Sequence, residues 1–557
     1  MRRLLHLFAL VLILVLPACN ESSDSDGEPL TAEAGFMEIE PVTFSVQQDG
    51  VSMTVTSSPA RLWYVFQPAD ENPKDKPTAI IFNGGPGSSS MYLFTSNTAR
   101  LTTDVNQTGT ESIVANPNAW TRFANLLYVD ARDCGFSYIA DENAALPEAR
   151  KALFDVQNFN AFLDAADFDR VLLRFLTDHP ALADNGVIVI GESYGGLRST
   201  LMLNLLLYHE RYEQGTEPYQ DTALFTELYA FLVRFMPENA PWRPEDVARF
   251  FGRQVLIQPY TFGDAQELVA GEMFETPGSI IYQVAEDTGT EYVTCGDDPD
   301  CNSWDNAVTF VQDVAERCPY YVIEGTTWLD DYWDKSVGPL TSTAGLAKAT
   351  AFPVPLVWQM YAENRTEAVR RIGADSAMDT SKLPAAARTR LRLQTAQAKR
   401  QALPAGDLAE TFGTLQPWDA YLLLGNQDVN FAFWVNTASE AGIDEILPYH
   451  SRMGELFLDN LRVTETFITN AAYDLICFTA AFPETIADYE DIESATLKTE
   501  GTEARPGVIE VLYAGEGEES ARLRTIRFPT YLSSHSVPVN KPEEITADIE
   551  EWLQESK

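Results

Sequence analysis

Basic residues are scarce in this chain of 557 residues. Lysine and arginine together number 39 against 82 aspartates and glutamates, which gives a formal net charge of −43 at pH 7. A surface of that sign repels phosphate groups, so binding through charge to nucleic acids or to anionic lipid surfaces is excluded. The acidic excess fits a soluble domain exposed to high salt or the cell exterior, and it does not indicate a particular reaction.

The apolar run near the N-terminus is too short for a membrane span. Leu4–Leu16 falls below the roughly 20 residues that a spanning helix needs, and it follows two arginines, as in a secretory signal. The small residues before Cys19 resemble a bacterial lipoprotein signal, although Pro17 is unusual there. We expect a signal peptide over residues 1–19 and a flexible tether over 20–35. The chain would be exported to the periplasm or cell surface and anchored to the outer membrane through lipidated Cys19; the alternative is a plain signal that is removed together with Cys19.

Cysteine is also sparse, with six residues in all. In an exported chain, cysteines can form disulfides, and Cys295, Cys301 and Cys318 are close enough in sequence to predict a local one, whose pairing stays open. The acidic loop around them resembles the start of a calcium loop. However, Ser303 stands in place of the turn glycine and Thr309 in place of the bidentate glutamate, so no metal is expected.

The pattern G-x-S-x-G surrounds Ser193 in the segment NGVIVIGESYGG, residues 185–196. Val187–Ile190 predicts a short buried strand, and the residues after the motif have the apolar spacing of a helix. Strand, glycine-flanked turn and helix together are typical of a nucleophile elbow, whose strained turn holds the serine hydroxyl above the sheet edge. The alternative is an ordinary strand-to-helix turn in which the serine caps the helix.

Strand and helix patterns elsewhere predict an α/β fold with a central, mostly parallel sheet and helices on both faces. The core is expected over residues 36–263 and 416–557. Between them, over 264–415, charged helical segments replace the strand rhythm and predict an inserted helical cap. Core strands are expected at 78–82, 124–131, 187–190, 253–262, 464–471, 508–515 and 522–532, with helices at 155–179, 197–210 and 542–554.

The partners of a serine nucleophile in such a fold follow in the order acid, then histidine, each on a loop after a strand. Asp474 follows the strand predicted at 464–471 and is the expected acid, which would hold the imidazole in one tautomer. His535 follows the last predicted strand and is the expected base. The other four histidines lie in the signal, before the serine, on the helix after the elbow, or before the returning strands: His6, His179, His209 and His450.

Five segments resemble sequence blocks of the serine carboxypeptidase family, and they occur in that family's order. They are IIFNGGPGSSS (80–90), NLLYVDARDCGFSY (125–138), GESYGG (191–196), YDLIC (473–477) and HSVPVNKPEEITADIEEWL (535–553). The resemblance extends over roughly 36–262 and 416–557 and implies an α/β-hydrolase fold. The predicted cap does not match the family.

The resemblance implies roles for individual residues. It implies a triad of Ser193, Asp474 and His535, and it makes Cys477 a thiol that lines the site without acting as a nucleophile. The backbone amides of two residues would form the oxyanion hole, and two side chains would bind the free α-carboxylate of a peptide; these are Gly85 and Tyr194, and Asn83 and Glu192. Binding of a carboxylate by Glu192 requires a proton on one of the two groups, because like charges in a closed site repel.

This chain departs from the family at positions near the implied site. The differences spare the triad, but they bear on C-terminal specificity, and the absence of the usual cysteine removes a disulfide. Ser88 replaces the usual cysteine, Asn97 a glutamate, Ile81 a tryptophan and Ser536 a methionine, and the segment 131–134 is one residue shorter.

The expected function is that of a serine carboxypeptidase, which releases C-terminal residues from peptides through an acyl-enzyme and needs no cofactor. A serine esterase or acyltransferase with the same triad is the alternative if Asn83 and Glu192 do not engage a carboxylate. A non-catalytic surface-binding protein on the same scaffold is a third possibility. The oligomeric state stays open.

Overall fold

The computed structural model describes ten segments of the chain and a few short pieces. The predicted signal and tether up to residue 29, nearly all of the predicted cap and the three clustered cysteines lie outside the described residues. Among the residues described, no helix is long and apolar enough to cross a membrane. The described residues are 30–48, 51–105, 111–135, 137–140, 157–237, 242–262, 449–471, 479–498, 507–533 and 535–555, with Gln266, Asp474, Cys477, β13 (Val322–Ile323) and β14 (Thr326–Thr327).

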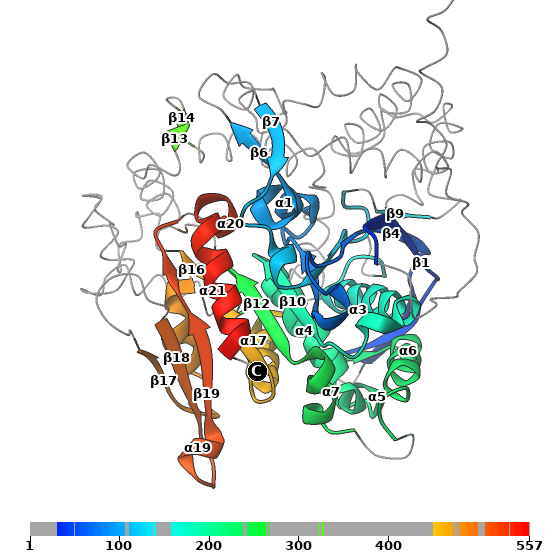
Figure 1. The fold of residues 1–557 in the computed structure, drawn as a ribbon. Coiled ribbons are helices and arrows are strands. Elements are labelled where there is room, and N and C mark those ends of the chain that lie inside the picture. Colours follow the sequence, from blue (N-terminus) through cyan, green and yellow to red (C-terminus); the bar gives the residue numbers. More distant parts are fainter. Residues whose placement is uncertain are drawn as a thin grey trace, which may run out of the picture.

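One large sheet organises these residues (Figure 1). The pairs from β8 through β19 are parallel, whereas the strands at both ends pair in antiparallel fashion. The spatial order is β1 (Glu33–Ile39), β4 (Ala60–Gln67), β8 (Asn125–Val129), β5 (Thr78–Phe82), β10 (Val187–Glu192), β12 (Arg253–Ile257), β15 (Glu465–Ile468), β19 (Leu523–Phe528), β18 (Gly507–Tyr513) and β17 (Ile492–Lys498), and β9 (Tyr138–Ile139) pairs with β4.

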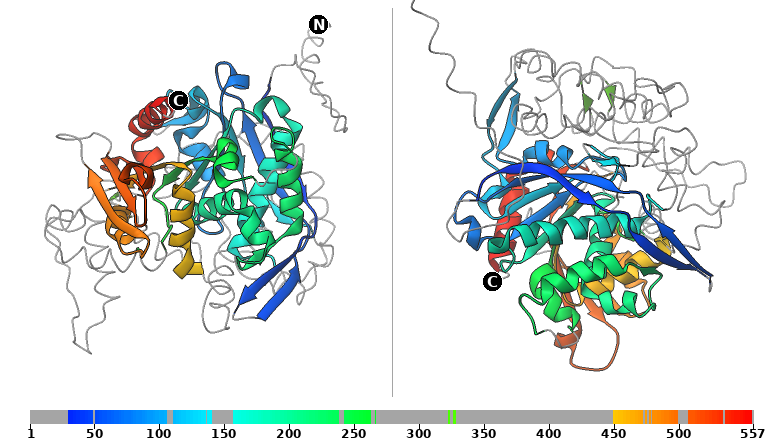
Figure 2. Two further views of the ribbon diagram at one scale, coloured as in Figure 1. Left: turned by 90° about the horizontal axis from the view of Figure 1, so that it is seen from below. Right: turned by 90° about the vertical axis from the view of Figure 1, so that its right-hand side faces the viewer.

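Helices cover both faces of the sheet, as the two views of Figure 2 show. On one face, Val189 of β10 belongs to the same apolar cluster as α3 (Ala161–Asp178) and α4 (Gly195–Leu207). On the other, Ile188 packs in a cluster with α21 (Pro542–Glu555). Strands buried on both faces need continuous apolar sequence, which is why Val187–Ile190 of β10 form an unbroken apolar run. The predicted α/β-hydrolase architecture is confirmed.

The remaining elements surround this core. Short helices are α1 (Met91–Leu93), α5 (His209–Glu213), α6 (Thr222–Leu232), α7 (Pro244–Phe251), α17 (Tyr449–Leu461), α18 (Phe482–Ala487), α19 (Glu519–Arg522) and α20 (Val537–Asn540). Small sheets contain β2 (Thr43–Gln48), β3 (Val51–Thr56) and β11 (Tyr219–Gln220); β6 (Leu101–Val105) and β7 (Glu111–Ala115); and β16 (Asn470–Ala471) and β20 (Thr530–Tyr531).

The boundaries differ from the sequence expectations at several elements, and three of them show the cause. β1 begins at Glu33, inside the predicted tether, because it pairs with β4 along its whole length. The strand expected over 253–262 ends at Ile257, where Gln258 takes a positive φ of 44°. The strand expected over 464–471 is split into β15 and β16, which pair with different partners. In each case, pairing between distant segments decides the boundary.

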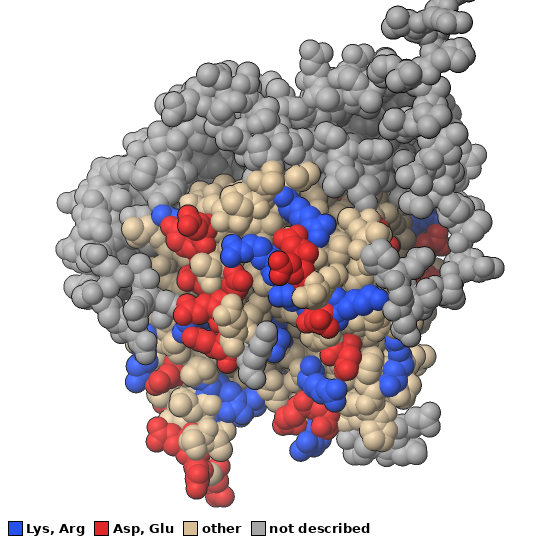
Figure 3. Space-filling model, viewed as in Figure 1, with Lys and Arg blue, Asp and Glu red and all other residues tan. Residues whose placement is uncertain are grey.

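Charged side chains of both signs are interspersed on the face seen in Figure 3. Several form ion pairs across the surface, such as Arg122 with Glu550 at 2.9 Å and Arg253 with Glu465 at 3.0 Å. Such exposed pairs each contribute about 0–1 kcal/mol.

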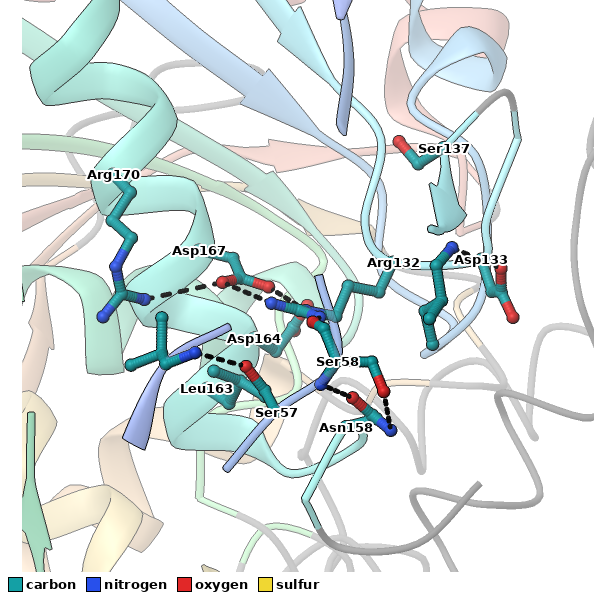
Figure 4. Close-up of polar contacts among 12 residues, drawn as sticks. Ser57, Ser58, Arg132, Asp133, Ser137, Asn158, Leu163, Asp164, Asp167 and Arg170 are labelled. Carbon is teal, nitrogen blue, oxygen red and sulfur yellow. Dashed lines mark hydrogen bonds and ion pairs between the residues drawn. The ribbon is translucent and has the colours of Figure 1, made fainter. Parts of the chain in front are cut away.

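A buried chain of charges ties the loop after β8 to the helical layer (Figure 4). Arg132 reaches from that loop to Asp167 on α3, with Nη2 donating to Oδ1 at 3.2 Å, and its Nη1 donates to the carbonyl of Ser58 at 2.6 Å. Arg170 donates to the same carboxylate at 3.5 Å and also pairs with Asp221, which caps α6. All four charged side chains are almost completely buried, so each relies on its partners for the solvation that water would provide.

Asp167→Ala is therefore expected to lower the free energy of unfolding by about 3–5 kcal/mol, because it removes a shared partner of two buried arginines. Chemical denaturation measures the change. The matched control is Asp184→Ala, which removes an exposed carboxylate 3.2 Å from Arg249 and should cost less than about 1 kcal/mol. Equal losses in both variants would contradict the importance of the buried chain.

Candidate active site

The candidate site lies at the carboxyl ends of the parallel strands. The chain runs from β5 to β8 on one side and then crosses to β10 on the other, so the strand order reverses between β5 and β10. At such a switch point, the loops leave the sheet in opposite directions and open a crevice in which ligands bind. Asn83 follows β5, and Glu192 is the last residue of β10.

Ser193 stands at the turn between β10 and α4 with a φ of 60°, in the left-handed region. A non-glycine residue there is strained and is held only where neighbouring bonds leave no alternative. Here the Ser193 amide donates to the carbonyl of Ile257 at 3.0 Å, and the Ser193 carbonyl accepts from the amide of Tyr260 at 2.9 Å. The turn therefore has the geometry expected of a nucleophile elbow, and the side chain of Ser193 is only partly buried.

Two glycines permit the close backbone packing around this turn. A Cβ at Gly84 would lie 2.4 Å from the amide nitrogen of Tyr194, and one at Gly191 would lie 2.4 Å from the carbonyl oxygen of Gly195. Real Cβ atoms do not approach so closely, so both positions require glycine. The glycine-rich loop after β5 thus lies directly against the elbow.

The backbone amides predicted to form the oxyanion hole belong to these two segments. Gly85 has a φ of 104°, and the loop closes through the Ser88 amide, which donates to the carbonyl of Gly84 at 3.2 Å. Because Gly84 touches the amide of Tyr194, the structure places Gly85 and Tyr194 on adjacent segments. Their joint role in binding an oxyanion stays a prediction.

The predicted acid and base are in direct contact. His535 Nδ1 lies 2.9 Å from Asp474 Oδ2, which leaves Nε2 as the ring atom that can serve as a base. Pairing of β16 with β20 brings together the two loops that carry these residues. Asp474 also accepts from the backbone amide of Cys477 at 3.2 Å.

Gln258 also orients the acid, and sequence reasoning missed it. Its Nε2 donates to Asp474 Oδ2 at 2.7 Å and to Thr479 Oγ1 at 3.0 Å, while its Oε1 accepts from Thr469 at 2.9 Å. The side chain is completely buried. The available signal was its position directly after β12, where a polar residue at the carboxyl end of a parallel strand faces the crevice.

The thiol of Cys477 connects the elbow to the acid loop. Ser193 Oγ lies 3.9 Å from Cys477 Sγ, so the serine and the loop that bears Asp474 face each other. The structure thus brings all three predicted triad residues to one edge of the sheet. The hydrogen bond from Ser193 to His535 that a working triad needs stays a prediction; such bonds are often long before substrate binds.

Two titratable groups in the site have shifted pKa values. Burial disfavours the charged form of Glu192 and raises its pKa to about 7, an effect that His535 and the Ser536 hydroxyl partly oppose. For His535, burial alone would lower the pKa, but the adjacent Asp474 carboxylate, together with Glu192, outweighs burial and raises it. The protonation states of the two groups are therefore coupled, because a charged Glu192 favours a charged His535.

Asn83 and Glu192, predicted to bind a substrate carboxylate, are hydrogen-bonded to each other. Asn83 Nδ2 donates to Glu192 Oε2 at 3.3 Å. Arg198 on α4 holds the backbone of Asn83, donating from Nη1 to its carbonyl at 2.7 Å, and Asp164 balances the buried guanidinium at 2.7 Å. Arg198 was not predicted, because its function depends on contacts with α3 and the loop after β5, neither of which is adjacent to it in sequence.

Comparison with known proteins adds to this geometry. The sequence model described as serine carboxypeptidase matches residues 39–218. The resemblance to serine carboxypeptidases is confirmed. The serine carboxypeptidase-like 12 protein of Arabidopsis thaliana is 29% identical over 25% of this chain and 29% of its own length. Serine carboxypeptidase S10 family member 1 of Dictyostelium discoideum is 30% identical over 28% of this chain and 33% of its own length. The match thus spans a third or less of either relative.

Solved structures show a more distant likeness. A prohormone-processing carboxypeptidase from Saccharomyces cerevisiae aligns over 94% of this chain and 91% of its own, with 14% identity and a TM-score of 0.47. A proline iminopeptidase from Mycobacterium smegmatis aligns over 92% and 98%, with 11% identity and a TM-score of 0.30. The fold is assigned from the strand order of the large sheet.

Gly84→Ala should disturb the elbow, because its Cβ would clash with the amide of Tyr194. We expect a loss of about 1–3 kcal/mol in the free energy of unfolding and a slower reaction of Ser193 with a fluorophosphonate probe, by about 100-fold. Thermal unfolding and probe labelling measure the two effects. The control is Gly35→Ala, where the new Cβ would lie 3.4 Å from the Tyr64 side chain; the same labelling rate in both variants would refute the packing argument.

Proposed function

We propose that this protein is a serine carboxypeptidase, which cleaves the last peptide bond of peptides with a free C-terminus. The observation that supports this most is the arrangement at one sheet edge: a strained Ser193 turn, an Asp474–His535 pair at 2.9 Å, and the bonded pair Asn83–Glu192 beside them. The first two elements suit acyl transfer, and the third suits a carboxylate ligand.

The reaction would proceed in two steps. His535 Nε2 takes the hydroxyl proton of Ser193 as Oγ attacks the scissile carbonyl, and the oxyanion is stabilised by the amides of Gly85 and Tyr194. The C–N bond then breaks as the imidazolium returns the proton to the leaving amine. Water, deprotonated by His535, hydrolyses the resulting acyl-enzyme, and Ser193 Oγ recovers its proton. Asp474 stabilises the imidazolium throughout.

Selectivity for a free C-terminus would depend on a protonated Glu192. A neutral carboxyl donates a hydrogen bond to the substrate carboxylate beside the donor of Asn83, whereas an ionised Glu192 repels it. The reactive form of the site therefore has its proton on Glu192 and a neutral His535. The alternative tautomer, with ionised Glu192 and charged His535, has the same total charge but cannot start the reaction.

The decisive experiment measures hydrolysis of blocked dipeptides with a free or an amidated C-terminus, with Ser193→Ala as the comparison. We expect wild-type cleavage of the free acids to exceed that of the amides by at least about 10-fold, as loss of one charged hydrogen bond implies. Ser193→Ala should reduce cleavage by about 10⁴-fold or more. Cleavage of simple esters but of neither peptide would move the function to an esterase or acyltransferase, and failure of Ser193 to react with a fluorophosphonate would favour a non-catalytic binding protein.

The pH dependence is a separate test. Because the pKa of Glu192 is raised to about 7, its proton is present below pH 7 and is lost above it. KM for free-acid peptides should stay low between about pH 5 and 6, where the peptide carboxylate is ionised. Above pH 7, KM should rise by up to about tenfold for each pH unit. Glu192→Gln is the control, since its amide does not titrate and should flatten this rise. A KM for wild type that is constant from pH 4 to 8 would contradict the role of Glu192.

We also propose that the chain is exported and attached to the outer membrane through Cys19. The support is the pattern of the first nineteen residues, which lie outside the described residues. Metabolic labelling with a fatty acid, compared with Cys19→Ala, tests the attachment.

A further inference from the structure

A line of hydroxyl groups ends on the buried carboxyl of Glu192. The hydroxyl of Ser536, the residue after His535, donates to Glu192 Oε1 at 3.0 Å. The phenol of Tyr92, on α1, is hydrogen-bonded to Ser536 Oγ. Since Ser536 gives its single proton to Glu192, Tyr92 must be the donor in the second bond. The line therefore runs from Tyr92 through Ser536 to Glu192.

These groups are fixed by their surroundings. Tyr92 is 6% exposed, and Glu192 is 1% exposed. The chain after Ser536 is held against the segment after α1, where Asn97 Nδ2 donates to the carbonyl of Pro538 at 3.3 Å. The Ser536 hydroxyl thus meets Glu192 from one side, while Asn83 meets it from the other.

We propose that Ser536, held by Tyr92, is a positioning residue that directs the proton of Glu192 onto Oε2, the oxygen beside Asn83. The reason is chemical. In a neutral carboxyl group, the oxygen that accepts the stronger hydrogen bond acts as the carbonyl oxygen, and the other carries the proton. Oε1 accepts from Ser536 at 3.0 Å, whereas Oε2 accepts the longer bond from Asn83 at 3.3 Å. With the shorter bond on Oε1, the acidic proton lies on Oε2, the oxygen next to the Asn83 amide. The Oε2 hydroxyl and the second N–H of the Asn83 amide can then both donate to one substrate carboxylate. This inference rests on the proposed carboxylate site and adds the group that orients it.

The Ser536 hydroxyl also affects the pH range of the site. The hydrogen bond that it donates stabilises the charged form of Glu192. This bond lowers the pKa of Glu192, whereas burial raises it. The charged groups that act on Glu192 are His535, which acts in the same direction, and Asp474, which acts in the opposite one. Removal of the hydroxyl should therefore have two separable consequences: weaker binding at acid pH, where Glu192 is neutral but its proton is no longer directed, and a shift of the pH midpoint to higher values.

The test measures binding of an Nα-benzoyl amino acid, a product-like carboxylate, by calorimetry from pH 4.5 to 8. All proteins contain Ser193→Ala, so that turnover plays no part. Adding Ser536→Ala should weaken binding about 10-fold at pH 5, as loss of one hydrogen bond implies, and move the midpoint of the pH dependence upward by about half a unit or more. Tyr92→Phe, which frees the serine hydroxyl to turn, should weaken it about 3-fold.

Two variants separate positioning from a general effect on structure. Ser536→Thr keeps the hydroxyl and should restore binding to within about 2-fold of the parent. Ser533→Ala removes a buried serine hydroxyl from the same segment, one that donates to Asn540 at 3.1 Å, and should change neither affinity nor midpoint. Equal affinities for the parent and Ser536→Ala at every pH would overturn the proposal, as would an equal loss in Ser533→Ala.

The same measurements distinguish a failure of the peptidase proposal from a failure of the positioning role of Ser536. If wild type cleaves no blocked dipeptide but the Ser193→Ala parent binds the benzoyl amino acid in a Ser536-dependent way, the peptidase proposal falls and the positioning role stands. If the parent does not bind the benzoyl amino acid at any pH, there is no carboxylate site for Ser536 to orient, and the inference is overturned.

Discussion

The close packing of three backbone segments around Ser193 is the constraint on which the rest of the site depends. The loop after β5, the β10–α4 turn and the residues after β12 approach so closely that side chains cannot replace Gly84 or Gly191. Backbone hydrogen bonds to Ile257 and Tyr260 hold Ser193 in a left-handed conformation. For a residue other than glycine, this backbone conformation costs about 1–3 kcal/mol. Burial of β10 on both faces keeps the strand from shifting to relieve this strain. The position of the hydroxyl thus follows from the packing of the sheet.

Electrostatics in this protein follow two different patterns. Beneath the sheet, three buried arginines are paired: Arg132 and Arg170 share Asp167, and Arg198 is balanced by Asp164. At the carboxyl ends of the parallel strands, Glu192 is buried without a cationic partner among its hydrogen bonds, so its pKa rises to about 7 and its charge varies in the physiological range. Paired charges fix the framework, while the unpaired carboxyl can gain or lose a proton. This contrast is what separates a structural charge network from a candidate binding group.

The two ends of the described chain contribute different parts of the site. Ser193, the bonded pair Asn83–Glu192 and the two amides proposed for the oxyanion hole come before residue 200, within the segment that matches the family sequence model. Asp474 and His535 come from the far end and are brought to the same edge by the parallel pairing of β12, β15 and β19. Asn460 on α17 reinforces the junction through bonds to Asn204 and to the carbonyl of Thr200 on α4.

The sequence by itself determined the elements with a local signal: the buried strands, the elbow at Ser193, and the choice of Asp474 and His535 by their order after predicted strands. These could be predicted because strand period, glycine placement and chain order are properties of neighbouring residues. Tertiary structure alone decided that Gln258 holds Asp474 and that Arg198 holds Asn83. It also decided that Tyr92 is bonded to Ser536, and Ser536 to Glu192. Those contacts join residues between 115 and 444 positions apart. No local pattern records such contacts, since the packing of the sheet and its helices determines where each side chain ends.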